Sequence, residues 1–181
     1  MRVIAGIHKG RRLVAPGGEA TRPTSDRARQ ALFDMLAHAP WADPMAGLRV
    51  LDAFAGCGAL GIEALSRGAG HATFMETAKP AQGAIRANIE ACHEGPRSAL
   101  LPADATRPPR APAPCSVVFL DPPYRSGLLP RALAALAAQG WFGPRAVLCL
   151  EMASDEPGEF AQEILAERTH GAARLVVLRA A

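Results

Sequence analysis

The chain has 181 residues, 49% of them hydrophobic, and a formal net charge of +3 at pH 7. This length is typical of one domain with a buried core, and the sequence contains no run of about 18 apolar residues that would predict a membrane span. The first residues turn polar before an apolar signal segment of about 7–15 residues could form, so we expect a cytoplasmic protein, monomeric by default. The cysteines and histidines are scattered without ligand spacing, and we expect no metal.

The positive charge is concentrated at the N-terminus. The first 30 residues carry seven Lys and Arg side chains against two acidic ones, whereas the remainder of the chain is slightly acidic. A basic end on a near-neutral body is typical of a surface that binds phosphates, although a solvated basic arm without a partner would look the same. The candidate nucleic-acid-binding residues are Arg2, Lys9, Arg11, Arg12, Arg22 and Arg27.

In this basic segment, residues 2–15 predict a short β-hairpin with a polar turn. A glycine- and proline-containing loop follows, and Thr24 or Ser25 is expected to cap a helix. Apolar residues then recur at helical spacing and predict one buried helix face. They are Ala28, Ala31, Leu32, Met35 and Leu36.

From residue 48 onward, segments typical of strands alternate with segments typical of helices, which predicts an α/β fold with a mostly parallel sheet. The last two strands flank Gly171-Ala172 and predict a closing antiparallel hairpin. We expect a single domain over 1–181, with a basic extension over 1–38 and a catalytic core over 39–181. Strands are expected over 48–54, 72–76, 98–103, 116–120, 145–151, 165–170 and 174–179, and helices over 60–67, 80–91 and 128–139.

The first core strand ends in a glycine-rich turn typical of a nucleotide-type cofactor site. Gly56, Gly58 and Gly61 form G-x-G-x-x-G, and Glu76 ends the next strand, where a carboxylate can accept hydrogen bonds from a ribose diol. The pattern fits a nicotinamide cofactor about as well as S-adenosylmethionine, and a turn without a ligand is a further alternative. Asp52 favours S-adenosylmethionine, because a carboxylate attracts the ammonium group of this cofactor and repels a pyrophosphate.

A third acidic residue, Asp104, follows the third core strand. Its carboxylate could accept a hydrogen bond from an adenine amino group. An N-cap or loop role is nearly as plausible, since Asp is favoured in such places.

The tetrapeptide Asp121-Pro122-Pro123-Tyr124 follows a buried strand and is the most informative motif in the chain. Two prolines stiffen the turn and remove two backbone donors, which leaves a corner rich in acceptors. The Asp121 carboxylate and the Pro122 carbonyl could accept both hydrogens of an exocyclic amine, so that its lone pair points at a methyl donor. Tyr124 offers a face on which an extruded base could stack.

With these motifs assembled, the sequence resembles the RsmD family of bacterial 16S rRNA guanine-N2 methyltransferases. The resemblance rests on the basic start, on residues 22–33, on the cofactor segment 51–67 and on residues 121–124. It implies a class I methyltransferase fold, S-adenosylmethionine as the cofactor, and ribosomal RNA in a small-subunit particle as the substrate. The candidate cofactor-binding residues are Asp52, Phe54, Gly56, Gly58, Glu76, Asp104 and Ala105, and the candidate catalytic residues are Asp121, Pro122, Pro123 and Tyr124.

Four rival functions explain part of this pattern. A DNA adenine-N6 methyltransferase needs an additional recognition element, and the expected sheet takes up most of the residues after Tyr124. A protein glutamine-N5 methyltransferase leaves the basic N-terminus unexplained. A nicotinamide-dependent oxidoreductase explains the glycine turn but not residues 121–124, and a non-enzymatic RNA-binding module lacks the aromatic residues expected on a strand.

Overall fold

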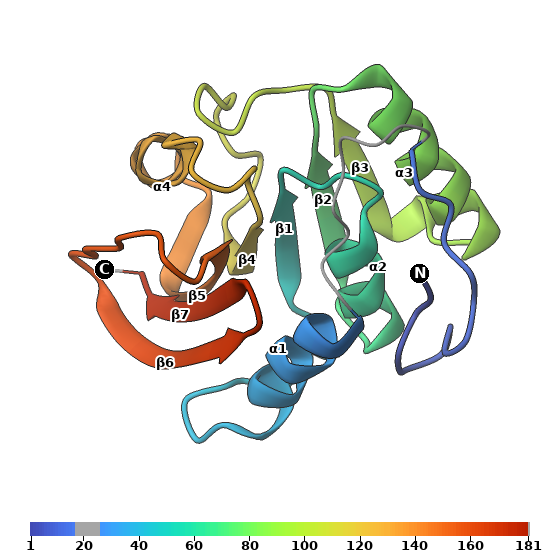
Figure 1. Cartoon of the computed structure of the whole chain (residues 1–181). Helices are drawn as coiled ribbons and strands as arrows, with labels where there is room; N and C mark the ends of the chain where they lie inside the picture. The colour runs from blue at the N-terminus through green and yellow to red at the C-terminus, as the bar shows by residue number, and fades with distance from the viewer. Residues whose placement is uncertain (17–25, 181) are drawn as a thin grey trace.

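A computed structural model describes residues 1–16 and 26–180 and contains one seven-stranded sheet. The strand order is β3-β2-β1-β4-β5-β7-β6 (Figure 1). Strands β1 to β5 pair in parallel, and β7 runs antiparallel to both β5 and β6, so the predicted fold class is confirmed. The strands are β1 (Arg49–Ala53), β2 (His71–Met75), β3 (Ser98–Leu101), β4 (Cys115–Leu120), β5 (Phe142–Ala153), β6 (Glu163–His170) and β7 (Ala173–Arg179).

Helices cover both faces of the sheet (Figure 1). Side chains alternate across a strand, so Val117 and Phe119 of β4 pack in one hydrophobic cluster with α1, α2 and α3, whereas Val118 and Leu120 pack in a second cluster with α4. Nearly continuous apolar strands are expected for a parallel sheet covered on both sides. The helices are α1 (Asp26–His38), α2 (Ala59–Ser66), α3 (Lys79–Ala91), the 3-10 turn η1 (Gly95–Arg97) and α4 (Leu128–Ala138).

Most strand boundaries differ from the prediction by one to three residues, and two of these differences follow from specific backbone pairing. β5 begins at Phe142, earlier than expected, because Phe142 pairs with Cys115 before a register shift in the β4–β5 ladder. β3 ends at Leu101, because the next backbone groups form a turn in which the Ala103 N–H bonds to the Leu101 carbonyl. Neither difference moves the ends of the central strands that carry the motifs.

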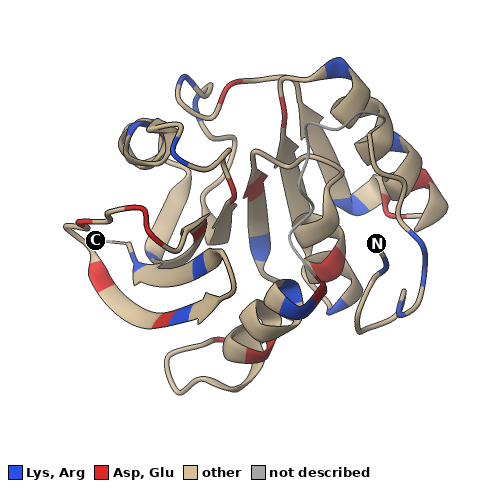
Figure 2. Ribbon diagram, viewed as in Figure 1, with Lys and Arg blue, Asp and Glu red and all other residues tan. Residues whose placement is uncertain are grey.

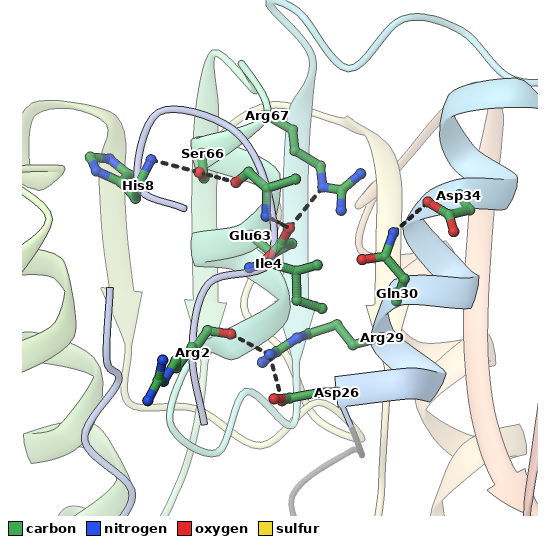
Figure 3. Close-up of polar contacts among 11 residues, drawn as sticks. Arg2, Ile4, His8, Asp26, Arg29, Gln30, Asp34, Glu63, Ser66 and Arg67 are labelled. Carbon is green, nitrogen blue, oxygen red and sulfur yellow. Dashed lines mark hydrogen bonds and ion pairs between the residues drawn. The ribbon is translucent and has the colours of Figure 1, made fainter. Parts of the chain in front are cut away.

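The N-terminal loop, residues 1–14, folds back on itself as a short antiparallel pairing, as predicted. Arg2 and Arg12 form an antiparallel bridge, the Val3 N–H donates to the Arg11 carbonyl at 2.9 Å, and the Leu13 N–H donates to the Met1 carbonyl at 3.1 Å. The N–H groups of Ile4 and Ala5 donate to the Glu63 carboxylate of α2, at 2.7 and 3.0 Å (Figure 3). A tertiary partner therefore adds to the local pairing that the sequence predicted.

Helix α1 buries the predicted face and two further residues beside it. Ala28, Leu32 and Leu36 are buried as expected and Met35 packs against the core while partly exposed, whereas the additional buried residues are Arg29 and Phe33. The Arg29 guanidinium donates to the Arg2 carbonyl and to Asp26 (Figure 3), and burial lowers its pKa from the ordinary value. One of the basic side chains counted in the N-terminal segment is thus interior. The predicted caps Thr24 and Ser25 lie outside the described residues.

Candidate active site

A cavity of about 740 Å³ opens at the carboxyl ends of β1, β2, β4 and β5. This edge of an open parallel sheet is where α/β proteins bind ligands. All the predicted catalytic and cofactor-binding residues except Gly58 line the cavity. The predicted residues found there are Asp52, Phe54, Gly56, Glu76, Asp104, Ala105, Asp121, Pro122, Pro123 and Tyr124.

Asp52 lies at the base of the cavity, near the end of β1, and is 1% exposed. Its Oδ2 atom accepts a hydrogen bond from the Gly61 N–H of α2 at 2.9 Å. Burial raises the pKa of Asp52 well above its usual range, and the nearby Asp121 and Glu76 carboxylates raise it further, against the opposing Gly61 bond. A cationic ligand group in the cavity would stabilise the carboxylate form.

The glycine turn after β1 shapes the wall of the cavity. Phe54 and Gly56 both line it and both have positive φ angles, 61° and 56°. Gly58, at the start of α2, does not line the cavity; it has φ 79°, and a Cβ there would lie 3.1 Å from the Phe74 ring. Gly58 therefore serves the turn and the packing of α2, while its neighbours Cys57 and Ala59 line the cavity; its contact with a cofactor stays a prediction.

Glu76 follows β2, and both of its carboxylate oxygens accept backbone hydrogen bonds. Oε2 accepts from the Gly56 N–H at 2.9 Å and Oε1 from the Ala78 N–H at 2.8 Å. A carboxylate has about four acceptor positions, so these bonds orient Glu76 and leave it able to accept from a ligand hydroxyl. Glu76 thus connects the glycine turn to the end of β2.

Asp104 forms the turn contacts that the sequence left open and also lines the cavity. Its Oδ1 atom accepts from the backbone N–H and the hydroxyl of Thr106, both at 2.8 Å, which is the hydrogen-bond pattern of a turn. These two bonds lower the pKa of Asp104 below its ordinary value, so the side chain is ionised. The residue also lines the cavity, next to the buried Ala105.

Asp121 and Pro122 leave the end of β4 directly into the cavity, as predicted. The next residue but one, Tyr124, donates its hydroxyl to Glu151 Oε1 at 2.7 Å. Arg125 forms an ion pair with Asp155 between exposed side chains. Its Nη2 atom donates to both carboxylate oxygens of Asp155, at 2.6 and 2.8 Å. The proline corner is therefore tied on one side to the residues that follow β5.

Sequence reasoning missed several residues of this cavity. Glu151, 8% exposed, lies in β5 and lines the cavity beside the proline corner. The signal that identified Asp121, an acidic residue after an apolar strand run, was available for Glu151 as well. The N-terminal loop and α1 also border the cavity, through Met1 and Ala28. No local pattern indicated that these segments reach the site.

None of the described predicted nucleic-acid-binding residues lines the cavity. Figure 2 shows the Lys and Arg positions along the N-terminal loop. Arg2, Lys9, Arg11, Arg12 and Arg27 are exposed, whereas Arg22 lies outside the described residues. Arg11 also donates to the Ala91 carbonyl at the end of α3. The N-terminal loop and the two residues after it thus reach the cavity through Met1, Ala15 and Pro16, whereas Arg11 lies at the C-terminal end of α3.

In residues 1–16 and 26–180, no group of three or more His, Cys, Asp or Glu side chains could hold a metal ion. Likewise, no helix in these ranges has the length and apolar character needed to cross a bilayer.

The sheet order, the closing antiparallel strands and the cavity over the glycine turn define the class of protein: a class I S-adenosylmethionine-dependent methyltransferase. The chain belongs to the family described as conserved hypothetical protein 95, whose model matches residues 1–179. The Ribosomal RNA small subunit methyltransferase D of Haemophilus influenzae is 34% identical over 161 residues, or 87% of this chain and 81% of its own. Its Escherichia coli K12 namesake is 34% identical over 83% of this chain and 74% of its own.

Solved structures agree with this assignment. A putative methyltransferase, yhhF, from Escherichia coli is 31% identical, with a TM-score of 0.82 over 99% of this chain and 97% of its own. A putative methyltransferase described as complexed with SAH has a TM-score of 0.60 at 16% identity, covering 83% of this chain and 48% of its own; it shares the fold. The resemblance to the RsmD family is confirmed.

Proposed function

We propose that this protein transfers a methyl group from S-adenosylmethionine to the exocyclic N2 amine of a guanine in small-subunit (16S) ribosomal RNA. The observation that carries the proposal is the single cavity that joins the Asp52–Gly56 turn to the Asp121–Pro122 corner. One side offers acidic groups for a cationic cofactor, and the other offers acceptors for an amine. The names of the curated relatives support ribosomal RNA as the substrate.

The residues on the β1 and β2 side fit the cofactor. Asp52 is a buried carboxylate whose pKa is raised mainly by burial, so it gains from a positively charged ligand group. Glu76 is oriented by two backbone donors and is suited to ribose hydroxyls, and Asp104 to an adenine amino group. When bound, S-adenosylmethionine supplies an electrophilic methyl group on a sulfonium.

The residues on the β4 side would orient the target amine. The nitrogen lone pair of an exocyclic amine is delocalised into the base, so the amine is a poor nucleophile. The Asp121 carboxylate and the Pro122 carbonyl would accept both hydrogens and favour a pyramidal nitrogen, with its lone pair toward the cofactor. Fixed acceptors aimed at the positive charge that develops on nitrogen stabilise the transition state. Tyr124, anchored through its hydroxyl, provides a face for base stacking.

The proposal includes an RNA-binding role for the basic residues of the N-terminal loop and α1. It retains the division into an extension over 1–38 and a catalytic core over 39–181, and a monomer that acts on a small-subunit particle or assembly intermediate. The exposed Arg2, Lys9 and Arg12 support this role, because they lie on a loop whose first residue borders the cavity.

The decisive experiment is transfer of a labelled methyl group to small-subunit particles that lack base methylation, with identification of the product nucleoside. We expect N2-methylguanosine. Asp121→Ala should lower kcat by about 100-fold or more, as expected for a lost transition-state contact, and should leave cofactor binding by calorimetry nearly unchanged. Loss of cofactor binding with retained turnover would contradict the assigned roles.

A further inference from the structure

Glu151 occupies the position on β5 that corresponds to Asp121 after β4. The two strands are parallel neighbours in which Leu120 pairs with Leu150, so the next residues along the chain are Asp121 and Glu151. Paired residues of neighbouring strands point to the same face, and their strands lie about 4.8 Å apart. Phe119 and Cys149 belong to the cluster beneath α1, α2 and α3. Asp121 and Glu151 follow two residues later, so their side chains point to the same face of the sheet.

The surroundings of Glu151 are those of a placed acceptor. The side chain is 8% exposed, lines the cavity together with Asp121 and Pro122, and accepts the Tyr124 hydroxyl at 2.7 Å. A carboxylate only accepts hydrogen bonds and has about four positions at which to do so. The cavity wall at this point therefore presents two carboxylates and one carbonyl, which select a ligand edge with several adjacent donors.

Among the bases that carry an exocyclic amine, guanine alone presents such an edge. Its N2 amine lies next to a protonated ring nitrogen, N1–H, whereas the ring nitrogen next to the amine of adenine or cytosine is an acceptor. An acceptor placed against another acceptor is repelled and loses its hydrogen bond. A site built to bond a specific donor rejects an analogue that lacks it more strongly than a hydrophobic pocket rejects a change in size.

We infer that Glu151 determines specificity for guanine by accepting its N1–H while Asp121 and Pro122 accept the hydrogens of the N2 amine. This inference rests on the proposed function and adds to it the reason for which guanine is chosen. The bond from Tyr124 fixes the rotamer of Glu151, so the stacking residue and the edge-reading residue are placed together.

The test uses 2-aminopurine, which keeps the 2-amino group but has an acceptor at N1. Small-subunit particles are reassembled from ligated ribosomal RNA that carries either guanine or 2-aminopurine at the methylated position. We expect the wild-type enzyme to prefer guanine by about 10- to 100-fold in kcat/KM, the range for one well-placed base contact. Glu151→Gln supplies an amide N–H for the N1 acceptor, so this preference should fall by about tenfold or more.

The readout is the ratio of kcat/KM on guanine to kcat/KM on 2-aminopurine. The missing O6 of 2-aminopurine affects every enzyme variant alike, so it does not change the comparison between variants. The matched control is Glu163→Gln, because Glu163 is an exposed acidic residue of β6. This variant should keep the wild-type ratio. Tyr124→Phe removes the hydroxyl and keeps the ring and Glu151. Because this hydroxyl holds the rotamer of Glu151, Tyr124→Phe should lose part of the preference. If Tyr124→Phe lowered the preference for guanine and Glu151→Gln left it unchanged, Glu151 would not read the base edge, and the inference would be overturned.

A second variant covers the case in which Glu151→Gln fails to fold, as judged by loss of cofactor binding. Glu151→Asp keeps the charge and withdraws the carboxylate by one methylene, so kcat/KM on guanine should fall by about tenfold while that on 2-aminopurine stays nearly constant. An unchanged guanine rate would overturn the inference. If the wild-type enzyme made N2-methylguanosine but used guanine and 2-aminopurine equally well, the inference about Glu151 would be overturned and the proposed function would stand. If the wild-type product were N6-methyladenosine, the proposed function would be overturned as well.

Discussion

At the residue scale, the site is a set of carboxylates with opposite tendencies to hold a proton. The pKa of Asp52 is raised, chiefly by burial, whereas hydrogen bonds from Thr106 lower the pKa of Asp104. Both carboxylates line one cavity, but only Asp52 is in an environment that disfavours its ionised form. Divergent pKa values within one cleft are typical of functional sites, and they agree with the proposed function, in which Asp52 faces a cationic group and Asp104 a neutral donor.

Asp52→Asn should stabilise the ligand-free protein and weaken cofactor binding. With a pKa raised in the folded state, native Asp52 lowers stability progressively as the pH rises from about 4, the pKa of an exposed Asp, toward its folded value. Asn carries no such penalty, and its amide oxygen can still accept the Gly61 N–H. The gain in Tm should therefore be small near pH 4 and should grow toward pH 8, by about 2–4 °C for each 1 kcal/mol.

Differential scanning calorimetry across this pH range, with and without cofactor, measures both effects. Asp43→Asn, in an exposed loop position, is the control and should show no pH-dependent gain. A Tm difference for Asp52→Asn that does not change with pH would contradict the raised pKa.

At the element scale, α2 holds the N-terminal loop against the core through polar contacts. Glu63, buried in α2, accepts the N–H groups of Ile4 and Ala5 and pairs with Arg67 at 2.8 Å (Figure 3). Ser66 accepts the His8 N–H at 3.0 Å. Gly6 has φ 81°, and a Cβ there would lie 1.8 Å from the Ser66 carbonyl, so this approach requires glycine. The loop is thus anchored as part of the folded unit.

Glu63→Gln should loosen the loop and weaken RNA binding more than cofactor binding. The amide NH₂ would face a backbone N–H, so one of the Ile4 and Ala5 bonds is lost, at a cost of about 1–3 kcal/mol for a buried donor left without a partner. Hydrogen exchange should accelerate at these two amides. Glu90→Gln, on the exposed side of α3, is the matched control. Unchanged exchange at Ile4 and Ala5 would show that the carboxylate does not hold the loop.

At the scale of the whole molecule, the arrangement of charge matters more than its sum. A net charge of +3 is unremarkable, but several exposed cations lie on the N-terminal loop, on the opposite face of the sheet from α4. Exposed basic residues attract a polyanion and position it through contacts with its phosphates.

Replacing Lys9 and Arg12 with Ala should weaken RNA binding and reduce its dependence on salt. Each lost phosphate contact lowers the slope of log K against log salt by about 0.7 on single-stranded RNA, so the pair should lower it by about 1.4. The control replaces Arg110 and Arg131, which are exposed. Arg131 lies in α4, and Arg110 precedes Ala111, whose N–H donates to the Gln139 carbonyl at the end of α4. Equal slopes for the two double variants would place the RNA on another surface.

The sequence by itself determined the class of fold and most of the cavity. Strand–helix alternation predicted the sheet, and the motifs at 52–61 and 121–124 were correctly placed at its carboxyl edge, because both are local in sequence and follow directly from strand ends. Only the tertiary structure decided the roles of Glu63, Arg29 and Glu151. Each depends on a hydrogen-bond partner far along the chain. Glu63 accepts from Ile4, Arg29 donates to Arg2, and Glu151 accepts from Tyr124. Strand order and helix docking bring such pairs together, and no local periodicity encodes them.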